Sequence, residues 1–288
     1  MTDPFALTQC KTMTLEDYHK MELNRYVMEP KIDGWRIQMD VTPDHITAWT
    51  RTNHIASGKL PRPEDALIAL AKSHGKSFRL DGEVVYLDAI GDPYFNYTSR
   101  CMGSRADVCV EKQREQDRYL SYVVFDILAL DDKDLRKAPM ESRRETLERI
   151  LYRESDYVFP IGISTPDVQV HFQNIEQFGE GSVLKDRLAP YAGKRHKSWL
   201  KWKAEETVDV VITGYKEGQG KFAGLIGAIE FRAPDGIMGN CSGMSDATRV
   251  EISNHREEYR GRTIEIKHYG ILVEGYRHPQ FVRFRYDK

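Results

Sequence analysis

Alternation of apolar and polar residues predicts several strands in the first two thirds of the chain. Trp35–Val41 alternates in this way, and His45–Arg51 follows it across a Thr-Pro-Asp turn, so the two segments predict a hairpin. Tyr119–Leu130 is almost continuously apolar, which is typical of a strand that is buried on both faces. Further strands are expected at Phe78–Leu87, Tyr157–Ile163 and Ser182–Lys185.

Helical periodicity appears between these strands. Arg62–Ser73 begins with proline and glutamate, which favour the first turn of a helix. Pro139–Tyr152 is amphipathic, and Arg105–Arg118 is a more polar helix candidate. The mixed order of strands and helices predicts an α+β fold for this part of the chain.

After the segment WLKWKAEE the pattern changes to short strands separated by glycine-rich turns, with one helix at Asp246–Tyr259. The expected strands are Val208–Lys216, Ala228–Ala233, Thr263–His268 and Phe281–Tyr286. Several short strands and one helix in so short a segment fit a small barrel of the oligonucleotide-binding (OB) type. We therefore expect two domains, residues 1–205 and 206–288, with a boundary near Glu205.

Composition limits the possible partners. The 288 residues are 40% hydrophobic and 30% charged, which is enough for one large domain or two medium domains, each with a core. The net charge is −2, so any binding of nucleic acid must depend on local positive charge. The four cysteines form no C-x-x-C pair, and no segment is apolar enough to span a membrane or to act as a signal peptide. We expect no structural zinc site, no membrane partner and a cytoplasmic protein.

Candidate chemistry begins at residues 29–36, EPKIDGWR. The amine of Lys31 is nucleophilic only when it is deprotonated. Asp33 alone would raise the pKa of Lys31, so Asp33 cannot be the only group that activates it. Gly34 allows a close turn, and Arg36 offers a planar fork for phosphate or ribose oxygens. Taken alone, this segment would more often be a solvated turn.

Further candidates follow in order along the chain. Glu83 interrupts an apolar strand, where a carboxylate is costly unless it is paired or bound to a metal. Phe125 ends the long apolar run and is either a core residue or a stacking wall for a base. Lys201 and Lys203 are two residues apart and so share one face of a strand, which suits an anion or a solvated strand face.

Six segments in order resemble the ATP-dependent DNA ligases of the nucleotidyltransferase superfamily. KIDGWR resembles the adenylation motif K-x-D-G-x-R, and the terminal RYDK resembles the R-x-D-K element of the barrel domain. The intermediate motifs are DGE, VFDIL, EGSVLK and WLKWK. Few residues precede Lys31, so we expect a minimal, two-domain form.

The resemblance implies a role for each matching residue. Lys31 would attack the α-phosphate of ATP and form lysyl-AMP, while Asp33 would hold a substrate hydroxyl or orient the loop of Gly34. The nucleotide would further be held by Glu29 at the adenine edge, Arg36 and Glu83 at the ribose, Phe125 against the base, and Lys201 and Lys203 at the α-phosphate. Arg285, Asp287 and Lys288 would orient pyrophosphate. Glu83 and Glu180 would bind Mg²⁺, for which Mn²⁺ can substitute.

Nicked double-stranded DNA is the expected partner of a monomeric enzyme. A basic segment adjoins the motifs, and its contacts would be independent of sequence and weakened by salt. The residues expected to contact DNA are Arg51, Arg100, Arg105, Lys185, Lys194, Arg195 and Lys197.

Two other readings share much of this pattern. An mRNA-capping guanylyltransferase has the same first motif, and a non-catalytic DNA-binding module could retain the fold. EGSVLK, Trp199 and the segment RHPQFVRFR favour the ligase. An RNA ligase and an NAD-dependent ligase fit less well, because the chain has the Asp33 motif and lacks a four-cysteine zinc module.

Overall fold

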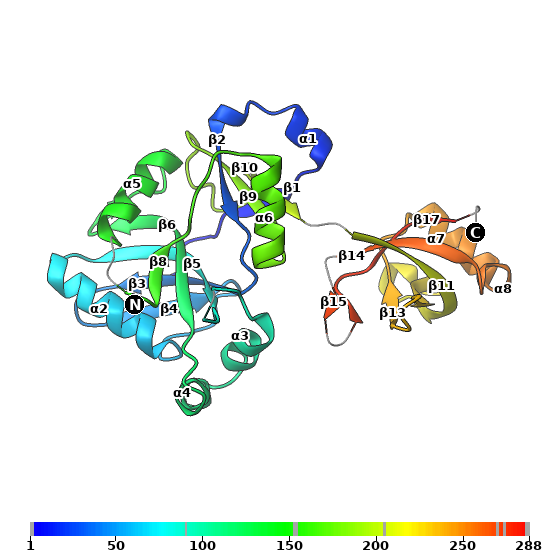
Figure 1. The fold of residues 1–288 in the computed structure, drawn as a ribbon, viewed down its shortest axis with the longest axis horizontal. Helices are drawn as coiled ribbons and strands as arrows, with labels where there is room; N and C mark the ends of the chain where they lie inside the picture. Colours follow the sequence, from blue (N-terminus) through cyan, green and yellow to red (C-terminus); the bar gives the residue numbers. More distant parts are fainter. Residues whose placement is uncertain are drawn as a thin grey trace. The chain divides into compact units, whose positions relative to one another are not determined.

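The computed structural model describes residues 3–89, 91–151, 155–203, 206–268, 271–272 and 275–285 (Figure 1). The chain divides into two compact units, Met1–Lys203 and Ala204–Lys288. Ala204 and Glu205 lie outside the described residues, so the boundary expected near Glu205 stays a prediction. Within the described residues, no helix is long and apolar enough to cross a membrane.

A six-stranded sheet forms one half of the first unit, in the order β4-β3-β5-β6-β7 with β8 beside β6. The strands are β3 Trp35–Val41, β4 Ile46–Thr50, β5 Phe78–Val85, β6 Ser121–Leu130, β7 Lys133–Asp134 and β8 Val158–Pro160. β3 and β5 are antiparallel, and Arg36 lies opposite Glu83. The hairpin of β3 and β4 was predicted from alternation and is confirmed.

A four-stranded sheet, in the order β1-β10-β9-β2, forms the other half of this unit. Its strands are β1 Gln9–Thr12, β2 Tyr26–Pro30, β9 Gly181–Asp186 and β10 Arg195–Lys203. β9 is antiparallel to both β2 and β10, whereas β1 runs parallel to β10. Sequence analysis expected Lys201 and Lys203 on a strand but did not identify β1 or β2.

Helices cover these sheets. They are α1 Leu15–His19, α2 Pro61–His74, α3 Phe95–Met102, α4 Ala106–Glu115, α5 Met140–Ile150 and α6 Val168–Phe178, with a short 3₁₀ helix, η1, at Leu23–Arg25. α2 begins with proline and ends at Gly75, whose φ of 59° only glycine adopts readily. The main core packs Leu67 of α2 against Phe78 and Tyr122 of the large sheet.

The second unit is built on a five-stranded antiparallel sheet in the order β13-β12-β11-β14-β17. Its strands are β11 Glu206–Glu217, β12 Ile226–Arg232, β13 Met238–Cys241, β14 Thr263–His268 and β17 Gln280–Phe284, with a small hairpin of β15 Ile271–Leu272 and β16 Gly275–Tyr276. A bridge from Ser242 to Gln280 brings the two edges of the sheet together. The core packs Phe231, Ile252 and Ile264.

The α+β prediction is confirmed, but several elements differ from the expectation. The single helix expected at Asp246–Tyr259 is two helices, α7 Asp246–Asn254 and α8 Arg256–Tyr259. His255 separates them with φ −126° and ψ 35°, which is not a helical conformation. A short 3₁₀ helix, η2, at Gly220–Phe222 follows β11.

Candidate nucleotide site

One face of the four-stranded sheet gathers the side chains around Lys31. The backbone N–H of Lys31 donates to Gly181 O at 2.8 Å, which places Lys31 beside the start of β9. On β10, Lys201 lies opposite Val183 and Lys203 opposite Gly181. Residues that are directly opposite in an antiparallel pair share a face. Lys31, Lys201 and Lys203 therefore lie on one face, as the spacing of the two later lysines predicts.

Glu180 links two of these lysines. One of its oxygens accepts a hydrogen bond from Lys31 Nζ, and its other oxygen lies 3.2 Å from Lys203 Nζ. The Glu180 side chain is buried, and Lys31 is 23% exposed. Burial would lower the pKa of Lys31, but the charge of Glu180 and its hydrogen bond with Lys31 outweigh this effect, so the net pKa is raised. In this arrangement Lys31 is an ammonium ion.

Among the described residues, Lys201 forms no ion pair with a carboxylate. Its pKa is lowered, first by burial and then by the neighbouring charges of Lys203 and Lys31. A half-buried cation beside two other cations is destabilised until an anion arrives. The three lysines therefore form a site that favours phosphate.

The turn after Lys31 passes close to β5. A Cβ atom at Gly34 would lie 2.3 Å from Val84 O and 2.9 Å from Glu83 Cγ, so only glycine fits there. Burial raises the pKa of Glu83 to about 8, although Lys31 and Arg36 act in the opposite direction. At neutral pH Glu83 is therefore mostly protonated in this structure, and a cation that binds it would displace the proton.

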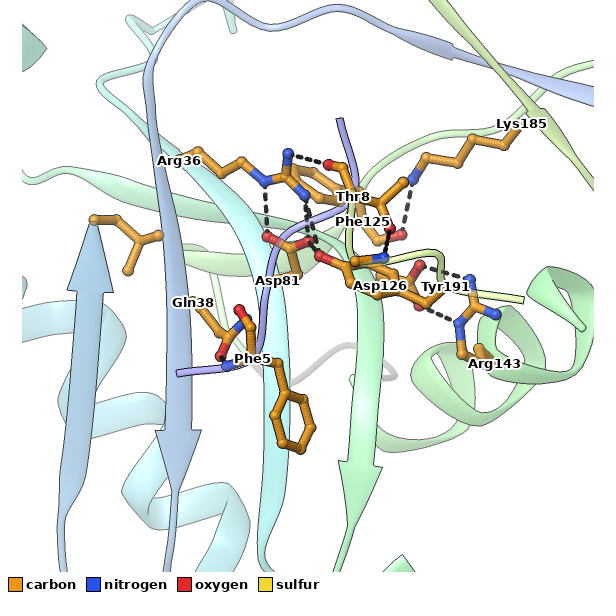
Figure 2. Close-up of polar contacts among 12 residues, drawn as sticks. Phe5, Thr8, Arg36, Gln38, Asp81, Phe125, Asp126, Arg143, Lys185 and Tyr191 are labelled. Carbon is orange, nitrogen blue, oxygen red and sulfur yellow. Dashed lines mark hydrogen bonds and ion pairs between the residues drawn. The ribbon is translucent and has the colours of Figure 1, made fainter. Parts of the chain in front are cut away.

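The guanidinium group of Arg36 is bound by other groups within the protein. Nε and Nη2 donate to the two oxygens of Asp81 at 3.0 and 2.7 Å, and Nη1 donates to Thr8 O at 2.6 Å (Figure 2). Tyr191 Oη donates to Asp81 at 2.6 Å, which completes the cluster. Burial opposes the charge of Arg36, but Asp81 outweighs this effect and raises its pKa. Contact with a ribose would require Arg36 to exchange part of this network.

Phe125 and Trp199 form an aromatic wall beside this cluster. Their rings meet edge to face, with centroids 5.8 Å apart. The guanidinium of Arg36 lies 5.3 Å from the Phe125 centroid, and Lys185 Nζ lies 4.1 Å from the Trp199 centroid. Phe125 is only half-buried, so part of its side chain stays accessible beside these cations.

Lys185 is buried, and this corrects one expectation. Its side chain is 1% exposed, and Nζ lies 2.8 Å from Glu29 Oε2. A side chain that is sealed in this way cannot touch a DNA duplex, so the DNA contact expected for Lys185 does not fit the structure. The pair places Lys185 beside Glu29, on the face of the sheet that carries Lys31.

The other cations expected to contact DNA are all exposed. Lys194, Arg195 and Lys197 lie at the start of β10 and just before it, where Arg195 donates to Cys10 O at 2.8 Å. Arg51 lies in the turn after β4. Arg105 begins α4 and pairs with Asp107 at 2.7 Å, and Arg100 lies in α3. Exposure alone does not test whether these residues bind DNA, so their DNA contacts remain predictions.

Of the three residues expected to orient pyrophosphate, only Arg285 is described. Arg285 Nη1 lies 3.2 Å from Asp209 Oδ1 and 3.7 Å from Glu265 Oε2, within the second unit. Asp287 and Lys288 lie outside the described residues.

Sequence reasoning missed two carboxylates, Asp81 and Asp126, that bind buried arginines. Asp81 immediately precedes the Gly-Glu pair of the third motif, yet only the fold shows that it binds Arg36. Asp126 follows Phe125 and binds Arg143 of α5 at 2.7 and 2.9 Å. The signal for Asp126 was a lone acid in an apolar strand, which requires a partner when it is buried.

Comparison with known protein families finds a matching domain for each of the two units. Residues 6–203 match the ATP dependent DNA ligase domain, and residues 217–285 match the DNA ligase OB-like domain. A probable DNA ligase of Streptomyces avermitilis is 34% identical over 239 residues, which are 78% of this chain and 45% of that protein. A DNA ligase of Haloarcula marismortui is 28% identical and is matched over 95% of this chain and 53% of its own length. The chain thus spans about half the length of the curated relatives it matches.

Solved structures agree on the fold. A structure described as an analysis of Lig E DNA ligases has a TM-score of 0.73 at 20% identity, covering 99% of this chain and 100% of that chain. The ATP-dependent DNA ligase from bacteriophage T7, in complex with ATP, has a TM-score of 0.54 at 19% identity, with 97% and 98% covered. The expected nucleotidyltransferase and OB folds are confirmed, and the chain belongs to the ATP-dependent DNA ligase family.

Proposed function

We propose that this chain is an ATP-dependent DNA ligase that seals single-strand nicks in duplex DNA, with Lys31 as its nucleophile. The observation that carries the proposal is the grouping of Lys31, Lys201 and Lys203 on one sheet face beside the aromatic wall of Phe125 and Trp199. Such a face offers a base a stacking surface and offers a triphosphate three amines.

In the first step the Lys31 amine attacks the α-phosphorus of ATP. A nitrogen–phosphorus bond forms, the bond to the β-phosphate oxygen breaks, and pyrophosphate leaves. Lys31 must first lose a proton to solvent, which Glu180 opposes by raising the pKa of Lys31. A cation that binds Glu180 would draw this carboxylate away from Lys31 and favour the free amine.

The carboxylates around Lys31 fit a magnesium ion that is shared with the nucleotide. Glu180 and Glu83 supply only oxygen donors, which Mg²⁺ prefers. Among the described residues, no group of three or more histidine, cysteine or acidic side chains is placed to hold a metal. Mg²⁺ commonly binds one or two carboxylates together with substrate phosphates, so this donor set suits an ion that arrives with ATP. When bound, the ion would neutralise phosphate charge at the site.

In the later steps AMP passes from Lys31 to the 5′-phosphate of the nick, and the 3′-hydroxyl then displaces AMP and closes the strand. The exposed cations Lys194, Arg195 and Lys197 are proposed to bind the DNA backbone, with Arg51, Arg100 and Arg105 as further contacts. We propose that the protein acts as a monomer. The roles of Arg285, Asp287 and Lys288 in step one, and the domain limits 1–205 and 206–288, belong to the same proposal.

The test incubates the protein with α-labelled ATP or GTP and magnesium, and then adds nicked duplex. We expect label from ATP on the wild-type protein, transfer of AMP to the nick and a sealed strand. Lys31→Ala should accept no label, yet it should still bind a pre-adenylated nick. Residual label on Lys31→Ala would refute the assignment of the nucleophile. Label from GTP alone, without sealing, would instead indicate a capping guanylyltransferase, and a protein without label after prior treatment with pyrophosphate would be a non-catalytic module.

A further inference from the structure

The residue before β1, Thr8, belongs to none of the motifs but contacts two parts of the first unit. Thr8 is fully buried, and its backbone oxygen accepts a hydrogen bond from Arg36 Nη1 at 2.6 Å (Figure 2). Its side-chain hydroxyl accepts a second hydrogen bond, from the backbone N–H of Gly193 at 2.9 Å. Thr8 therefore joins the arginine of the first motif to the chain that leads into β10.

The backbone turns at Gly193, immediately before the exposed cations of β10. Gly193 has a φ of 64°, a left-handed conformation that glycine adopts readily. A Cβ atom there would lie only 3.3 Å from Ala6 O, so the N-terminal segment packs closely against this turn. A partly buried N–H group needs an acceptor, and the hydroxyl of Thr8 supplies it. The path of the chain into Lys194 and Arg195 thus depends on this contact.

Further hydrogen bonds fasten the same N-terminal segment to the start of β10. The N–H of Gln9 donates to Lys194 O at 3.1 Å, and Arg195 Nη1 donates to Cys10 O at 2.8 Å. Gln9 Oε1 also accepts from Arg195 at 3.1 Å and from Arg51 at 3.4 Å. Because this amide is neutral, it brings two guanidinium groups together without cancelling their charge. The segment therefore determines where these exposed cations lie.

The two hydrogen bonds of Thr8 use different atoms and can be separated by substitution. Arg36 is bound by the carbonyl oxygen, which any residue at this position supplies. Gly193 is bound by the hydroxyl, which serine also carries. Valine is branched at Cβ like threonine but has no hydroxyl, so it would leave the N–H of Gly193 without its acceptor.

We propose that Thr8 is a positioning residue for DNA binding: through its hydroxyl it fixes the turn at Gly193 and so presents Lys194 and Arg195 to the phosphates of nicked DNA. This inference rests on the proposed function, because it concerns the duplex that the enzyme would seal. It gives a buried, uncharged residue outside the motifs an effect on contacts that are made by charge alone.

The test measures the affinity for a nicked duplex with a 3′-dideoxy end, which cannot be sealed, over a range of salt concentrations. In Thr8→Val the slope of log K against log salt should be shallower by about 1, and the affinity should be lower by about tenfold at about 0.1 M salt, as expected for one lost phosphate contact. Thr8→Ser keeps the hydroxyl and should retain both values. The kcat/KM for lysyl-AMP formation from ATP should fall by at most about twofold in Thr8→Val, because the carbonyl that binds Arg36 remains.

A matched control removes another hydroxyl that accepts a backbone N–H. Ser253 Oγ accepts from the N–H of Ile226 at 3.0 Å in the second unit, and Ser253→Ala should leave the salt slope unchanged. If Thr8→Val does not fold, Thr8→Ala is measured in its place, with the same expected change in slope. A wild-type slope in these Thr8 variants, even with lower affinity, would overturn the inference, and so would a Thr8→Ser protein with the shallower slope. A wild-type protein that takes no label from ATP would overturn the proposed function instead.

Discussion

The buried ion pair between Asp126 on β6 and Arg143 on α5 gives the sharpest test of how buried charges affect the stability of the first unit. The two side chains are 2% and 0% exposed, and Arg143 also donates to Ala138 O at 2.6 Å. Asp126 lies directly opposite Asp81 in the pairing of β5 with β6. Like charges in that position destabilise a sheet unless each has its own partner, and Arg36 and Arg143 serve as those partners.

Arg143→Met should therefore leave a buried carboxylate without its cation, at a cost of about 3–5 kcal/mol. With a urea slope of about 2–3 kcal/mol per molar for a unit of this size, the unfolding midpoint should fall by about 1–2.5 M. All four tryptophans of the chain lie in the first unit, so their fluorescence reports the unfolding of that unit within the intact protein.

The double variant Arg143→Met with Asp126→Leu tests whether the unpaired charge causes the loss of stability. Because it removes both charges, it should be clearly more stable than Arg143→Met alone. Arg105→Met, which breaks the exposed pair with Asp107, should hardly move the midpoint. Asp126→Leu is measured alone as well. If the losses of stability in the two single variants simply add in the double variant, the charges of Asp126 and Arg143 are not coupled and the argument fails.

Two further predictions concern the site itself. Glu180→Gln removes the carboxylate that raises the pKa of Lys31, so the pKa of Lys31 should fall. Acylation of Lys31, followed by peptide mapping, should therefore begin at lower pH than in the wild-type protein. An unchanged pH profile would show that Glu180 does not control the pKa of the amine. Replacing Lys194, Arg195 and Lys197 with glutamine should weaken binding to nicked DNA and reduce the slope of log K against log salt by up to about 3. The control Lys72→Gln on α2 should leave this slope unchanged. A wild-type slope in the triple variant would mean that the three cations do not contact phosphates.

Strands were predicted well where their alternation was regular. β3 was predicted from Trp35 to Val41 and has those bounds, because one of its faces packs into the core and the pattern records that face. α6 was missed, although Asp167 caps it by accepting from the N–H groups of Gln169 and Val170, and Gly179 ends it at a φ of 76°. The alternating valines at its start resemble a strand, and tertiary packing overrides that local preference.

Motif residues could be found from the sequence, but their partners could not. Glu83 stood out because charge in an apolar strand is unusual, whereas Lys31 and Glu180 stood out through the motifs that contain them. The binding of Arg36 to Asp81 and of Tyr191 to the same carboxylate joins residues that are 45 and 110 positions apart. Nothing in local composition records such a pairing, because it depends on the register of β3 against β5 and on where the segment before β10 crosses them.

These pairings explain how a site rich in cations can exist before a nucleotide arrives. Lys31, Arg36 and Lys185 each face a carboxylate, so burial does not leave their charges uncompensated. Lys201 differs, because burial and then its neighbours Lys203 and Lys31 lower its pKa. An incoming phosphate should therefore gain most at Lys201, where it relieves repulsion without first breaking an internal pair. From there it can reach Lys203, the next cation on the same face of the strand, which makes Lys201 the proposed point of entry of phosphate into the site.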